Sequence, residues 1–153
     1  MTDAKTRKRV LILCTGNSCR SQMAEGLWRS IVGDKWDVHS AGLKPAGYVH
    51  PMAITVMHEA GVDISAQASK HVDRFMGQPF DLVITVCDNT HESCPTLPGA
   101  KSVEHWPFDD PAAAIGPEPD VLEAFRKVRD QIRGRILCFL KLPVADATAG
   151  GRG

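Results

Sequence analysis

Residues 10–21 read VLILCTGNSCRS, and this stretch decides the fold. Val10 to Leu13 form a short, continuous apolar run, which is typical of a strand covered on both faces in a parallel sheet. A glycine-containing turn follows, and apolar residues then recur every four positions from Met23 to Ile31. Gly33 stands where a helix would end. The order predicts a strand, a loop and a helix over residues 21–32.

The rest of the chain alternates in the same way. Three more strands are predicted, at residues 36–40, 80–86 and 103–106. A helix is predicted from Pro51 to Gly61, and a long one along the apolar stripe of residues 121–136. This alternation predicts a three-layer α/β fold, in which a central four-stranded parallel sheet has helices on both faces.

Length and charge limit the possible functions. A chain of 153 residues is the size of one domain, so we expect residues 1–153 to form a single domain, with a basic N-terminal extension at residues 1–8 and a disordered tail at residues 145–153. The 18 basic and 18 acidic side chains cancel, which argues against a nucleic-acid partner. The apolar run at residues 10–13 is too short for a secretion signal or a membrane span, so we expect a cytoplasmic protein without a membrane partner.

The five cysteines are the next signal. In a chain without an export signal, cysteines are better interpreted as thiols than as structural disulfides. Cys14 and Cys87 each follow a predicted strand. Because parallel sheets bind ligands beyond the carboxyl ends of their strands, both thiols are expected at the functional edge.

The loop from Cys14 to Arg20 has the composition of an oxyanion site. The backbone N–H groups of such a loop, together with the N-terminus of the helix that follows, converge on a tetrahedral anion, and Arg20 can bind two of its oxygens. The same field favours a thiolate, which makes Cys14 a candidate nucleophile, and Ser21 could donate to it. The expected oxyanion-binding residues are Thr15, Gly16, Asn17, Ser18, Cys19, Arg20 and Ser21.

Two residues of this loop have expected structural tasks. Gly16 would let the backbone approach the anion closely, and the side chain of Asn17 would hold the loop through bonds to peptide groups. The plain alternative is that Cys14 is a buried core residue and Arg20 a surface side chain. The position of the loop between a strand and a helix favours the anion site.

At this point a family resemblance becomes specific. The loop and the following Ser21-Gln22-Met23-Ala24-Glu25-Gly26 resemble the thioredoxin-coupled arsenate reductases, which share their fold with the low-molecular-weight protein tyrosine phosphatases. The resemblance continues through Ser40-Ala41-Gly42, Val86-Cys87, Cys94-Pro95 and the segment from His105 to Pro111.

The resemblance implies a reaction and its residues. Cys14 would attack arsenate held by Arg20, and Asp110 would protonate the departing oxygen, with Asp109 as its substitute. Cys87 would then attack the sulfur of Cys14 and release arsenite. Cys94 would transfer the disulfide away from Cys14, ready for reduction by thioredoxin or another thiol donor. Phosphate and sulfate would mimic arsenate, and no cofactor is expected.

Other interpretations of the cysteines remain. Cys87, His91 and Cys94 could form part of a zinc site, although their spacing lacks the usual Cys-x2-Cys hooks, or the two cysteines could be unrelated thiols. Cys19 is expected to face the core or to pack behind the loop, and Cys138 to be a small buried residue on the last helix. The six histidines are expected to be surface or structural side chains.

The resemblance also has two departures. Asn17, Glu25 and Ser40 match side chains of a monovalent-cation site found in some reductases, but Lys70 stands where those members have an aspartate. Its ammonium group could occupy the place of the cation, so no metal ion is expected. Asp110-Pro111 is followed by Ala112-Ala113 rather than the aromatic pair of many phosphatases.

Two other functions compete with arsenate reduction. A phosphotyrosine phosphatase would use the same loop, and its extra cysteines would protect Cys14 from oxidation. An oxyanion sensor would bind phosphate or arsenate without turnover. Asp110 and the two additional thiols favour the reductase.

Overall fold

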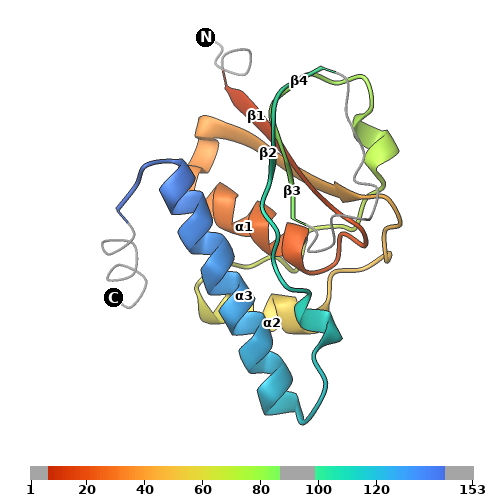
Figure 1. Ribbon diagram of the computed structural model, residues 1–153, viewed down its shortest axis with the longest axis vertical. Helices are drawn as coiled ribbons and strands as arrows, with labels where there is room; N and C mark the ends of the chain where they lie inside the picture. The colour runs from red at the N-terminus through yellow and green to blue at the C-terminus, as the bar shows by residue number, and fades with distance from the viewer. Residues whose placement is uncertain (1–6, 87–98, 144–153) are drawn as a thin grey trace.

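The computed structural model describes residues 7–86 and 99–143. Within these residues, four strands form one parallel sheet in the order β2-β1-β3-β4 (Figure 1). They span Lys8–Cys14 (β1), Trp36–Gly42 (β2), Phe80–Thr85 (β3) and Ala100–His105 (β4). The predicted four-stranded parallel sheet is confirmed.

The burial of each strand follows its place in the sheet. In β1, which pairs on both sides, residues Val10 to Leu13 are at most 1% exposed. In β4, which pairs on one side within the described chain, Val103 remains 59% exposed. The continuous apolar run at residues 10–13 therefore marks the centre of the sheet, as expected for a strand covered on both faces.

In the described parts of the chain, three α-helices connect and cover the strands, at Arg20–Val32 (α1), Pro51–Glu59 (α2) and Glu118–Phe139 (α3). Short 3₁₀ helices lie at Gly33–Lys35 (η2), Val72–Phe75 (η3) and Pro111–Ala113 (η4). The start of α2 has proline at its first position and a side-chain cap from His50. Its end is followed by Gly61 at φ +83°, a left-handed conformation that glycine adopts cheaply.

The two faces of the sheet are covered unequally (Figure 1). One face packs Val10 and Ile12 against apolar side chains of all three α-helices. The other face packs Leu11 and Leu13 against Phe75 and its neighbours in η3. Helices thus lie on both faces, but on the second face the described helix is a single 3₁₀ turn.

An aromatic cluster ties α3 to the chain that leaves β4. Trp28 of α1 stacks on Trp106 at a centroid distance of 6.0 Å, and Phe139 packs on both rings. The indole N–H of Trp106 donates to Glu104 at 2.7 Å. Because Trp106 is anchored in this way, residues 107–110 are held close to the carboxyl end of the sheet.

One cysteine was predicted wrongly. Cys138 is exposed, not buried. The buried stripe of α3 runs through Val128, Ile132 and Ile136, and position 138 is rotated about 200° from position 136 in a helix of 3.6 residues per turn. No helix within residues 7–86 and 99–143 is long and apolar enough to cross a membrane.

Candidate active site

Cys14 is the last residue of β1 and lies at the carboxyl end of the sheet. Its side chain is 5% exposed, and its Sγ lies 3.0 Å from the Ser21 hydroxyl. Asn17 donates its side-chain N–H to the same hydroxyl oxygen at 2.7 Å. Because that oxygen already accepts a hydrogen bond, its proton is available to the sulfur. The expected donation from Ser21 to Cys14 therefore fits the geometry.

One backbone N–H group of the loop points toward the sulfur. The carbonyl oxygens of Thr15, Gly16 and Ser18 accept hydrogen bonds from the main chain of residues 44–50, at 2.8–3.0 Å. In a planar trans peptide the N–H of the next residue points the opposite way. The N–H of Asn17 does so, and donates to Cys14 Sγ at 3.2 Å.

Helix α1 begins directly behind this loop. Its N-cap residue, Cys19, makes no side-chain capping bond. The N-terminal N–H groups of a helix need partners, and an anion bound in the loop would supply them. The N-terminus of α1 therefore lies beside Cys14, where its N–H groups suit an anion.

Asn17 holds the loop in its shape. It has φ +49°, a left-handed conformation that asparagine adopts more readily than other side chains. Its fully buried amide donates to the hydroxyls of Ser21 and Ser40 and accepts from the main-chain N–H of Lys70 at 2.8 Å. The side chain braces the loop, but through two hydroxyl groups and the distant main chain of Lys70, not through the neighbouring peptide groups that were predicted.

Two glycines near the loop differ in what they allow. A Cβ atom on Gly42 would lie 2.5 Å from the Thr15 carbonyl oxygen and 2.9 Å from that of Cys14, so only glycine fits there. A Cβ atom on Gly16 would meet only Ser18 Oγ, at 3.8 Å. The fold itself therefore requires glycine at position 42. At position 16 the fold would accept a Cβ atom, so a requirement for glycine there would come from the bound anion.

Arg20 links the loop to the segment that carries Asp110. It is 8% exposed and donates to the Phe108 carbonyl oxygen at 3.1 Å. Another of its nitrogens lies 3.8 Å from the Asp110 carboxylate, which also accepts from the Ala112 N–H at the start of η4. These contacts favour Asp110 over Asp109 as the acid beside the loop.

The second cysteine of the loop, Cys19, is a buried and unreactive thiol. Cys19 is 3% exposed and belongs to the apolar core, as expected. Burial raises the pKa of its thiol to about 12, against the opposing effect of a hydrogen bond with Ser18. Cys19 is therefore a thiol at neutral pH and has little nucleophilic character.

A buried ion pair between Lys70 and Glu25 lies next to Ser40, which accepts a hydrogen bond from Asn17. Ser40 donates to the Glu25 carboxylate at 2.5 Å, and Lys70 Nζ lies 3.7 Å from the same carboxylate oxygen. Burial lowers the pKa of Lys70, while Glu25 opposes that shift. The ammonium group thus lies beside Glu25, one of the side chains that match the cation site.

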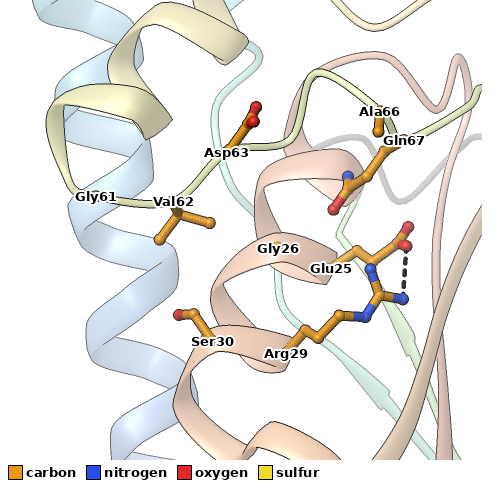
Figure 2. Close-up of a pocket in the computed structure, with 9 residues that line it drawn as sticks. All are labelled: Glu25, Gly26, Arg29, Ser30, Gly61, Val62, Asp63, Ala66 and Gln67. Carbon is orange, nitrogen blue, oxygen red and sulfur yellow. Dashed lines mark ion pairs between the residues drawn. The ribbon is translucent and has the colours of Figure 1, made fainter.

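A separate pocket of about 510 Å³ lies between α1 and residues 61–67 (Figure 2). Arg29 pairs with Glu25 at its wall, at 2.9 Å. Gln67 also lines it and donates to Gln22, which in turn donates to the Asn17 carbonyl oxygen. No residue of the Cys14 loop lines this pocket, so the pocket lies behind the loop and is not the anion site.

His50 is a residue of the site that the sequence did not indicate. Its main-chain N–H donates to the Ser18 carbonyl oxygen at 3.0 Å, and its ring caps α2. Capping side chains are usually those of serine, threonine, aspartate or asparagine, so a histidine before Pro51 gave little signal. The proline immediately after it was the only hint.

Some predicted residues lie outside the described ranges. Cys87, His91 and Cys94 fall within residues 87–98, so neither the thiol relay nor the alternative zinc site can be placed. Among the residues that are described, no three histidine, cysteine, aspartate or glutamate side chains form a metal-binding group.

Comparison with known proteins agrees with this geometry. The family described as low molecular weight phosphotyrosine protein phosphatase matches residues 9–142. An arsenate reductase of Halalkalibacterium halodurans is 48% identical over 133 residues, which are 87% of this chain and 95% of that protein.

Solved structures extend the comparison. An arsenate reductase in the phosphate-binding state superposes with a TM-score of 0.73 at 36% identity, over 92% of this chain and 98% of that one. An arsenate reductase in the oxidised state gives a TM-score of 0.74 at 34% identity, with the same coverage. A thioredoxin-dependent arsenate reductase of Corynebacterium glutamicum gives 0.65 at 29% identity, over 88% of this chain and 61% of that one. By fold, sequence and loop geometry together, the chain belongs to the low molecular weight phosphotyrosine protein phosphatase family.

Proposed function

We propose that this protein reduces arsenate to arsenite, with Cys14 as the nucleophile. The observation that carries the proposal is the set of donors around Cys14 Sγ, where the Asn17 N–H and the Ser21 hydroxyl both lie within 3.2 Å. Two relatives, 48% and 47% identical to this chain, are named arsenate reductase, and the proposed substrate is taken from them. Phosphate and sulfate are expected to bind in the same place because they share the tetrahedral shape and charge.

The first step is a displacement at arsenic. The loop amides and Arg20 hold arsenate, and the Cys14 thiolate forms a sulfur–arsenic bond as one arsenic–oxygen bond breaks. Asp110 gives its proton to a departing As–OH group, which leaves as water. The 3.8 Å separation of Asp110 from Arg20 puts this acid close to the oxygens that Arg20 would bind. Asp109 instead lines a hollow with Gln131 and Arg135 of α3.

The second stage transfers two electrons. Cys87, as thiolate, attacks the sulfur of Cys14, and the electron pair of the sulfur–arsenic bond passes to arsenic. Arsenic(V) becomes arsenic(III) and leaves as arsenite, while a Cys14–Cys87 disulfide forms. Cys94 then attacks Cys87, which frees Cys14 and leaves a Cys87–Cys94 disulfide. The family resemblance and the positions of these cysteines in the sequence support this order.

An external thiol donor must complete the cycle. Thioredoxin is the proposed donor, in keeping with the thioredoxin-dependent relative. It would reduce the Cys87–Cys94 disulfide and become oxidised in exchange. We place the protein in the cytoplasm, where such a donor keeps thiols reduced. No other cofactor is needed, because the electrons come from thiols.

The proposal is tested by arsenite production from arsenate with thioredoxin, thioredoxin reductase and NADPH. Sustained arsenite release in step with NADPH consumption is expected. Cys14→Ser should abolish it, whereas Cys138→Ser should not, since that exposed cysteine lies on the last turns of α3. NADPH consumption that is equal with and without arsenate would refute the proposal.

Aryl phosphate hydrolysis is the second candidate activity. The matched family is named for it, and the loop and Asp110 would serve both reactions in their first step. Against it, η4 offers only Ala112 and Ala113 beside Asp110, so no aromatic side chain there can stack on an aryl ester. Rapid hydrolysis of an aryl phosphate without any arsenite production would make this the primary activity.

A further inference from the structure

The side chain of Ser69 joins the anion loop to the chain that follows β2. Its hydroxyl donates to the Gly16 carbonyl oxygen at 3.3 Å and accepts the Gly47 N–H at 3.2 Å. The same carbonyl oxygen accepts the Ala46 N–H at 2.8 Å. A carbonyl oxygen has two lone pairs, and both are therefore engaged by groups outside the loop. The Gly16 oxygen is thus held by two segments that lie far apart in the sequence.

The peptide between Gly16 and Asn17 depends on these bonds for its orientation. A Cβ atom at position 16 would meet only Ser18 Oγ, at 3.8 Å, so little packing surrounds this residue. Glycine also turns more freely about its backbone bonds than any other residue. Asn17 has φ +49°, a left-handed conformation that residues other than glycine rarely adopt. Hydrogen bonds to the Gly16 oxygen therefore have to keep this peptide in place.

The same peptide carries the N–H group that faces the nucleophile. In a planar trans peptide, the carbonyl oxygen and the N–H of the next residue point in opposite directions. Fixing the Gly16 oxygen therefore directs the Asn17 N–H, which lies 3.2 Å from Cys14 Sγ. A hydrogen bond donated to a thiolate stabilises it relative to the thiol, and the thiolate is the nucleophilic form. The Ser69 hydroxyl can thus affect the reactivity of Cys14 through one rigid peptide.

We propose that Ser69 is a positioning residue, which holds the Gly16 carbonyl oxygen so that the Asn17 N–H stays directed at Cys14 Sγ. This inference rests on the proposed function, because it takes Cys14 as the nucleophile of arsenate reduction. Without the Ser69 hydroxyl, the Gly16 oxygen keeps the bond from Ala46 but loses its second donor. The peptide can then rotate, and the thiolate loses part of its stabilisation.

The test follows the alkylation of Cys14 by iodoacetamide as a function of pH, in reduced protein free of phosphate, with mass spectrometry to separate the labelled peptides. In Ser69→Ala the midpoint of this rate profile should move upward by about half to one pH unit, the worth of one hydrogen bond. Below the midpoint, alkylation should be about three- to tenfold slower at a given pH, and the two rates should converge at high pH. Arg20 and Asp110, the charged side chains at the loop, are the same in both proteins. The exposed Cys138 is an internal reference, whose profile should not change.

The control variant is Ser30→Ala, at an exposed position of α1 where the hydroxyl donates to the Leu27 carbonyl oxygen of the same helix at 2.9 Å. It should leave the profile of Cys14 unchanged. If the profile does not move in Ser69→Ala, even with a lower urea midpoint, or moves equally in Ser30→Ala, the inference is overturned and arsenate reduction is untouched. A profile that moves as expected in a protein that produces no arsenite would overturn the proposed function and leave the positioning of Asn17 standing.

Discussion

Gly42 provides a direct test of how the sheet shapes the anion loop. Gly42 ends β2 and pairs in register with Cys14. In Gly42→Ala the new Cβ would lie 2.5 Å from the Thr15 carbonyl oxygen, against the 3.4 Å at which ordinary contact begins. The atoms that block it belong to backbone and cannot rotate away, so the loop must shift by roughly 0.9 Å.

Overpacking of this kind costs about 1–3 kcal/mol. The shift moves the peptide that carries the Gly16 N–H, which we expect to be one of the donors to a bound anion. We therefore expect the free energy of unfolding in urea to fall by that amount. The dissociation constant for phosphate, measured by calorimetry, should rise at least about tenfold, which corresponds to 1.4 kcal/mol.

The matched control is Gly134→Ala in α3, where an added Cβ meets no atom within 4 Å. That variant should bind phosphate normally and gain up to about 1 kcal/mol of stability from helix propensity. If Gly42→Ala binds phosphate as tightly as wild type and unfolds at the same urea concentration, the close approach is not what shapes the loop, and the reasoning fails.

Four further predictions follow from other contacts. Asn17→Gly and Asn17→Ala should both lose phosphate binding. Glycine adopts the left-handed backbone more easily than alanine, so the alanine variant should be less stable in urea by about 1 kcal/mol. Equal stability of the two variants would exclude strain at φ +49°. Iodoacetamide should modify Cys14 and Cys138 but spare Cys19, because burial raises the pKa of Cys19 to about 12. Phosphate should protect Cys14 alone, and mass spectrometry locates the label. Fast labelling of Cys19 in the native protein would contradict its burial. Burial would raise the pKa of Asp37, but hydrogen bonds from Arg9 and His39 lower it below 3.8. The ionised Asp37 therefore stabilises the folded protein above pH 3.8, and this contribution is lost as pH falls through the folded-state pKa. Asp37→Asn should weaken the fall of the urea midpoint at acid pH, and an unchanged fall would contradict the prediction. Lys70 Nζ lies beside Glu25, where its ammonium group would take the place of a bound potassium ion. Replacing potassium by choline at constant ionic strength should therefore not change kcat/KM for arsenate. A severalfold loss would show that the ammonium does not occupy the cation's place.

The arrangement of strands could be predicted because burial in a parallel sheet leaves a plain pattern. The apolar run at residues 10–13 identified β1, although the strand extends to Lys8 because its first residues pair with Trp36 and Asp37. Cys138 was misplaced because an apolar residue type says little about helix face when it lies two positions from the buried stripe.

The core of the site was predictable for a local reason. A thiol and a guanidinium at the two ends of a loop between a strand and a helix are fixed relative to each other by that short segment. The supports of the loop are not local. Lys70 and Gly42 meet it only through the tertiary fold, and His50 does so from a helix cap of unusual type. Such contacts leave no spacing pattern in the sequence: Lys70 and Gly42 were singled out only through the family resemblance, and His50 was not singled out at all.

The most direct test of arsenate reduction at Cys14 is a single turnover without any external reductant. The fully reduced protein is mixed with excess arsenate, and arsenite is counted per chain. Since each chain can pass on only the electrons of its own thiols, we predict a burst of about one arsenite per chain that then stops, and none from Cys14→Ser. A wild-type protein that binds phosphate in the loop but releases no arsenite would contradict the account.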